Sequence, residues 1–151
     1  MSFKLATATL SALIVLSGTA FAQKVNLENG VAIKGYDPVA YFTDHKPIKG
    51  VPEYRADYEG ATYEFTSVAH RILFVEAPEK YVPQFGGFCA YGTALGHKAD
   101  VDPTAFTIVD GKLYLNYNAK VMTSWRQDIP GYIVKATKAW PNVSQQTAVA
   151  H

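Results

Sequence analysis

Two dipeptides, Glu59-Gly60 and Asp110-Gly111, each stand between short stretches in which apolar and polar residues alternate. Alternation with a period of two predicts a half-buried β-strand, and an acidic residue followed by glycine favours the tight turn of a β-hairpin. The stretches are EYRADY and ATYEFT around the first dipeptide, and AFTIV and KLYLNY around the second. The sequence therefore predicts two hairpins that contribute to a small antiparallel sheet.

Short helices are predicted around these hairpins, because several polar residues stand where a helix N-cap is expected. Asp37 precedes a proline, Ser67 precedes VAHRILFVEA, and Asn118 precedes a further helical stretch. The last predicted helix covers residues 132–140 and is ended by Pro141, since proline removes a backbone donor. Two hairpins with short flanking helices indicate an α+β fold.

The N-terminus has the pattern of a secretory signal peptide. Lys4 precedes an apolar run that leads to a small-x-small sequence at positions 20–22. The run is shorter than the roughly 20 residues that span a membrane. We therefore expect residues 1–22 to be removed and the protein to be periplasmic or secreted. Residues 23–141 are expected to form one domain, and the polar residues 142–151 a flexible tail.

Charge and cysteine content narrow the possible partners. The 14 Lys and Arg residues nearly balance the 13 Asp and Glu residues, and loss of Lys4 with the leader would make them equal. Nucleic acids and anionic membranes attract basic surfaces, so neither is an expected partner. Cys89 is the only cysteine and has no intrachain disulfide partner, so the hydrophobic core must hold the fold.

Three segments together resemble an exported YHS-domain protein: GYDPVAYF, YEGATYEFTSVAHRILFVEAPEKYVPQFGGFCAYG and DGKLYLNYN. The resemblance covers about residues 36–95, and a longer exported form continues to about residue 140. It implies a small antiparallel sheet with helices packed on it. Shorter YHS modules accompany metal transport and carry cysteines where this sequence has Ala40, Thr66 and His70 or its neighbour Ala69. Because that cysteine set is missing, metal binding is not inherited directly from the resemblance.

A candidate metal site centres on Cys89 in the glycine-rich segment GGFCAYGTALGHK. If residues 90–94 are helical, Cys89 lies near the helix N-terminus, where free amides and the helix dipole favour a thiolate. His70 is the preferred nitrogen partner, since it stands near a ligand position of the related modules, and His97 is the third candidate. Thiolate and imidazole suit copper(I), which is the favoured metal, with zinc as the alternative.

Other interpretations stay open. Cys89 is equally explained as a buried thiol packed among Phe85, Phe88 and Tyr91. The protein would then be a protein-interaction or small-ligand-binding module, with tyrosines lining a pocket or filling the core. Catalysis is not expected, because no recognised nucleophile, phosphate-binding or HExxH motif occurs. His45 in a loop and His151 in the tail are assigned no role. The oligomeric state is not predicted.

Overall fold

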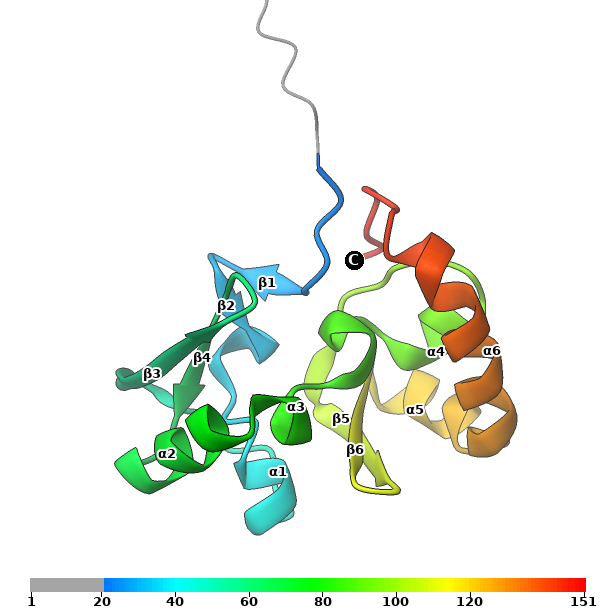
Figure 1. The fold of residues 1–151 in the computed structure, drawn as a ribbon. Coiled ribbons are helices and arrows are strands. Elements are labelled where there is room, and N and C mark those ends of the chain that lie inside the picture. The colour runs from blue at the N-terminus through cyan, green and yellow to red at the C-terminus, as the bar shows by residue number, and fades with distance from the viewer. Residues whose placement is uncertain (1–20) are drawn as a thin grey trace, which may run out of the picture.

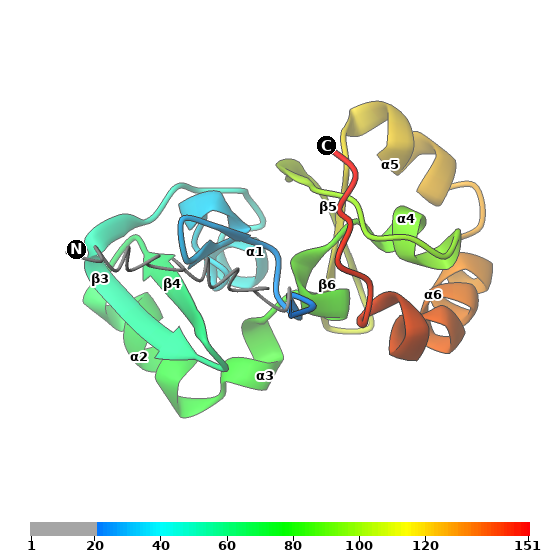
Figure 2. The ribbon, with the colours of Figure 1, turned by 90° about the horizontal axis from the view of Figure 1, so that it is seen from above.

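The computed structural model describes residues 21–151, which form two lobes lying side by side (Figures 1 and 2). The first lobe contains β1 (Leu27–Glu28), β2 (Val31–Ala32), the 3-10 helix η1 (Ile33–Gly35), α1 (Ala40–Thr43), β3 (Val51–Tyr58), β4 (Ala61–Phe65), α2 (Val68–Glu76) and α3 (Pro78–Tyr81). The second contains the 3-10 helix η2 (Gln84–Gly87), α4 (Ala90–Ala94), β5 (Asp102–Val109), β6 (Lys112–Asn116), α5 (Ala119–Trp125) and α6 (Ile129–Val143). The predicted α+β fold class is confirmed.

Both predicted hairpins form, and each belongs to its own sheet. β3 and β4 pair with β1 and β2 in a four-stranded sheet of order β1-β2-β4-β3, while β5 and β6 form a two-stranded sheet. The pairing of β2 with β4 is parallel and the others are antiparallel. At both turns, Glu59-Gly60 and Asp110-Gly111, the two central residues have positive φ. A turn with two consecutive left-handed residues matches the twist of the two strands, and an acidic residue followed by glycine favours this turn.

The helix boundaries follow side-chain caps. Ser67 accepts a hydrogen bond from the His70 amide at the start of α2, and Asn118 accepts one from Val121 at the start of α5. Both predicted caps are therefore confirmed. The predicted end of the last helix at Pro141 is wrong, because α6 continues through Pro141 to Val143. Only two residues of α6 follow Pro141, so the backbone bond that proline cannot make lies in the last turn of the helix.

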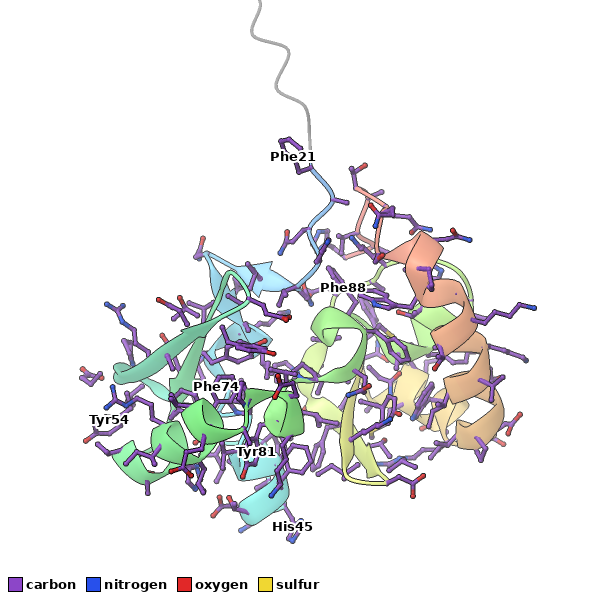
Figure 3. All side chains as sticks on the ribbon, viewed as in Figure 1. Phe21, His45, Tyr54, Phe74, Tyr81 and Phe88 are labelled. Atoms are coloured by element: carbon purple, nitrogen blue, oxygen red, sulfur yellow. The ribbon has the colours of Figure 1, made fainter. Side chains whose placement is uncertain are left out.

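Aromatic side chains fill the cores of both lobes. In the first lobe the Phe74 ring lies 4.8 Å from Tyr63 and 5.1 Å from Phe65, centroid to centroid. In the second lobe buried Trp125 lies 5.5 Å from Tyr114. Figure 3 shows buried Phe74 inside the first lobe and buried Phe88 near the N-terminal segment, and the rings of Tyr41 and Phe106, 5.0 Å apart, join the two lobes. Such rings bury a large apolar area and dominate the packing energy of a small domain.

The two ends of the described chain lie against the second lobe. The Asn26 amide donates to the Gly86 carbonyl, and Ala150 exchanges backbone hydrogen bonds with Lys98 and Asp100. The buried Lys98 ammonium donates to the carbonyls of Gln23, Ser144 and Gln146, which ties both ends together. Residues 142–143, placed by the sequence in a flexible tail, belong to α6, and the chain then returns to the domain at Ala150.

Two expectations concern the cellular location of the protein. Most of the predicted signal peptide, residues 1–20, lies outside the described residues. Among residues 21–151, no helix has both the length and the apolar content needed to cross a membrane.

Candidate functional site

A pocket of about 300 Å³ lies beside Cys89 in the second lobe. Its wall is mainly apolar, with a thiol and two imidazoles among the lining residues. These residues are Cys89, Tyr91, Gly92, Leu95, His97, Ala99, Tyr117, Val121, Ala150 and His151. An apolar hollow with a few polar groups is the usual form of a small-ligand site, and this pocket is at the lower end of the common size range.

Cys89 is the N-cap of α4, as the glycine-rich sequence suggested. Its Sγ accepts a hydrogen bond from the Gly92 amide at 3.4 Å and lies 3.7 Å from Oδ1 of Asn116, to which the thiol donates. The residue is only 1% exposed. Burial raises the pKa of the Cys89 thiol, and the Gly92 amide opposes that rise only in part. The expected thiolate is therefore disfavoured, and the free protein holds a protonated thiol at neutral pH.

His97 reaches the same pocket through the turn that follows α4. Its amide donates to the Gly92 carbonyl, and Gly96 adopts a positive φ of 93°. A Cβ atom at position 92 would lie 3.4 Å from Nε2 of His97, so the imidazole packs directly on the α4 backbone. Two of the three predicted ligands, Cys89 and His97, are thus brought to one pocket.

His151 is a third donor on the pocket wall that sequence reasoning did not select. The bridge between Ala99 and Ala150 carries it there, and its Nδ1 lies 3.9 Å from Oδ2 of Asp100. A polar sequence such as NVSQQTAVAH holds no signal for this pairing, because a single bridge between distant segments leaves no periodic pattern.

His70 occupies a different environment in the first lobe. Its Nδ1 lies 2.6 Å from Oδ2 of Asp37, and its Nε2 lies 3.4 Å from Oγ1 of Thr43 and 3.7 Å from Oδ2 of Asp44. The Asp37 carboxylate is completely buried and also accepts hydrogen bonds from Thr66. A carboxylate in this position fixes the orientation of an imidazole. The pairing of His70 with Asp37 was not anticipated, because Asp37 was assigned only as a helix cap.

Asp37 caps the chain as predicted, but the helix that follows begins two residues later than expected. Its Oδ1 accepts the amides of Val39 and Ala40, while the helix itself begins at Ala40. One carboxylate therefore closes the turn before α1 with one oxygen and holds the β4–α2 connection with the other.

The structure does not bring His70 to Cys89. Helix α2, which carries His70, and helix α4, which begins after Cys89, lie in different lobes in both views (Figures 1 and 2). His70 does not line the Cys89 pocket, and the polar contacts of the two side chains share no residue.

The donor set limits which metal the chain would hold. Within residues 21–151, no three or more His, Cys, Asp and Glu side chains are grouped so as to bind a metal ion. A structural zinc site takes four ligands and does not fit this arrangement. The Cys89 thiol and the His97 imidazole are both donor types that soft copper(I) accepts.

Comparison of the chain with protein-family models, curated proteins and solved structures found no match, so the site stands on its own geometry.

Proposed function

We propose that this protein is a small, non-catalytic, exported metal-handling module of YHS type, and that copper(I) is its cargo. The observation that carries the proposal is that Cys89 and His97 line one pocket. Sulfur and imidazole nitrogen are the donor pair that separates copper(I) from harder cations.

The surroundings of Cys89 and His97 favour a copper(I) ion that can exchange with a partner over an ion that is bound permanently. Two protein donors leave the coordination of the ion open, as a carrier requires if a partner is to take the ion over. Binding must release the proton of the buried Cys89 thiol, whose pKa is raised by burial, so affinity is expected to rise with pH. His151 also lines the pocket, but its Nδ1 lies near Asp100, and it does not complete a three-donor group with Cys89 and His97.

The decisive experiment is a copper(I) titration against a competing chelator under reducing conditions. Cys89→Ser keeps an oxygen acceptor for the Gly92 amide at the helix N-cap but removes the thiolate. His97→Gln removes the second donor. Each substitution should weaken copper(I) binding by more than about 100-fold, since even residues outside the ligand set change metal affinity by about 10–100-fold.

Two histidines provide matched controls. His45 lies at the outer end of the first lobe beyond α1 (Figure 3), and His45→Asn should bind copper(I) as the wild type does. His70→Gln should do the same if the site is built from Cys89 and His97. Equal affinity of the wild type and Cys89→Ser would overturn the proposal. Weakening by His70→Gln in a folded protein would restore the pairing predicted from sequence.

A second candidate is a protein-interaction module, favoured by the outer face of α2. Three apolar residues of this helix, Val68, Ile72 and Val75, are 47%, 48% and 63% exposed. Contiguous exposed apolar groups mark contact surfaces. A photoreactive amino acid at position 72 should then cross-link a partner in cells, while one at exposed Lys138 on α6 should not. Equal labelling at both positions, or none at position 72, would remove this candidate.

A further inference from the structure

A second pocket lies where the two lobes meet, away from Cys89. Its volume is about 560 Å³, and its wall combines the N-terminal segment, the β3–β4 hairpin, the stretch around η2 and the end of α6. In Figure 1 the hairpin belongs to the first lobe and α6 to the second, so the pocket is shared between them. Ligand sites occur preferentially at such junctions.

Three aromatic residues line this pocket, and each is held by a phenylalanine of its own lobe. Tyr63 and Tyr58 pack on Phe74, with ring centroids 4.8 Å and 6.1 Å away. Across the lobe boundary, the Trp140 ring lies 5.9 Å from Phe85 and 6.3 Å from Phe88. Aromatic groups fixed in this way bind a ligand without losing rotational freedom at that moment.

Further contacts hold the pocket wall in shape. The Tyr58 hydroxyl donates to Glu79 at 3.2 Å, which anchors the ring at the end of β3. On the other side, a Cβ atom at Gly86 would lie only 2.0 Å from the Lys24 carbonyl oxygen, so only glycine allows the N-terminal segment to approach so closely. The position of the N-terminal segment in the pocket wall therefore depends on glycine at position 86.

The lining also contains one acidic and one basic side chain. Glu59 stands in the turn of the β3–β4 hairpin, and Lys24 lies in the N-terminal segment. Aromatic rings attract organic cations through their electron-rich faces, most strongly for tryptophan, and a nearby carboxylate adds to that attraction. A lysine on the same wall would repel a simple cation but would bind a carboxylate on the same ligand.

We propose that this inter-lobe pocket binds a small zwitterion that carries a substituted ammonium group and a carboxylate. The ammonium group lies between Trp140 and Tyr58 beside Glu59, and the carboxylate faces Lys24. This site is separate from the copper(I) pocket and does not depend on the function proposed for it.

The test is calorimetric titration of the purified full chain with N,N,N-trimethylglycine. Acetate and tetramethylammonium serve as half-ligands, each carrying one of the two charged groups. The zwitterion should bind at least about 10-fold more tightly than either half-ligand, a difference easily resolved by calorimetry. Ligand should also change the tryptophan fluorescence, because Trp140 lines the pocket whereas Trp125 is fully buried.

Substitutions in the lining test whether the ligand binds in this pocket. Glu59→Gln and Lys24→Gln change exposed residues, so they should fold normally and weaken binding by about 10-fold each. Lys138→Gln, an exposed change on α6 outside the pocket lining, is the matched control and should bind as the wild type does. Absence of binding to the wild type, binding as tight for either half-ligand, or unchanged affinity in both pocket variants would overturn the proposal.

Discussion

The Oδ2 atom of Asp37 lies 2.6 Å from the Nδ1 atom of His70, although 33 positions separate the two residues in the chain. The same carboxylate accepts the amides of Val39 and Ala40 and both the amide and the hydroxyl of Thr66. A single buried group thus joins the turn before α1 to the connection between β4 and α2.

Removing this carboxylate should be among the most damaging single changes in the first lobe. Asp37→Ala leaves several buried donors without an acceptor, and we expect it to lower the free energy of unfolding by about 3–5 kcal/mol. His70→Gln should cost less, about 1–2 kcal/mol, because its side chain is partly exposed. Urea unfolding of both variants and the double variant should give a coupling energy of about 1–3 kcal/mol. Strict additivity would show that the contact contributes no coupling to stability.

The Cys89 thiol should react slowly with a disulfide reagent in the native protein. It is 1% exposed, and burial raises its pKa, so the reactive thiolate is scarce near neutral pH. Guanidinium should restore the rate of an ordinary free thiol. Measurement of absorbance with time at several pH values tests this, with Cys89→Ser as the blank. A native rate equal to the denatured rate would contradict the buried position.

Stability should fall steeply at alkaline pH because of Tyr41. Burial, with smaller contributions from nearby acidic groups, raises the pKa of this phenol well above its ordinary value. The unfolded chain therefore releases the proton from about pH 10, where the folded chain retains it. Each such tyrosine makes unfolding easier by about 1.4 kcal/mol per pH unit above that point.

Substitution of Tyr41 provides the control for the alkaline effect. The hydroxyl donates to the Pro103 carbonyl at 2.8 Å, so Tyr41→Phe should cost about 1 kcal/mol at neutral pH. The difference in free energy of unfolding between Tyr41→Phe and the wild type should shrink between pH 10 and 11. Only the wild type has a phenol proton at this position that the unfolded chain can release. Denaturant unfolding at several pH values measures it, and parallel curves would refute the assignment to Tyr41.

Gly86 and Gly30 form a matched pair for the contact between the N-terminal segment and the second lobe. Both have positive φ, but a Cβ atom would meet the Lys24 carbonyl at position 86 and only open space at position 30. Gly30→Ala should cost about 1–2 kcal/mol from backbone strain alone. Gly86→Ala should cost about 1–3 kcal/mol more, since the backbone must move. Equal losses of thermal stability would mean that the close approach to Lys24 is not maintained in solution.

Local features of the fold were predictable because their causes are local. The turns at Glu59-Gly60 and Asp110-Gly111 need two consecutive residues with positive φ, and the caps Ser67 and Asn118 act within three residues. The predicted start of the last helix, at residue 132, was too late. Asp128 is the N-cap of a helix that begins at Ile129 and has Pro130 in its first turn.

The sites depended on contacts between distant segments. Cys89 and His97 could be associated from sequence because only one short helix and a turn separate them. The pairing of His70 with Asp37 required the β3–β4 hairpin to fold between them, and the inter-lobe pocket required Lys24, Glu59 and Trp140 to meet from three parts of the chain. The sequence by itself therefore determined the hairpins, most caps and the Cys89 segment, since these follow from neighbouring residues. Only the tertiary structure decided which donors share a pocket and whether the thiol ionises, because burial and long-range packing arise from the whole fold.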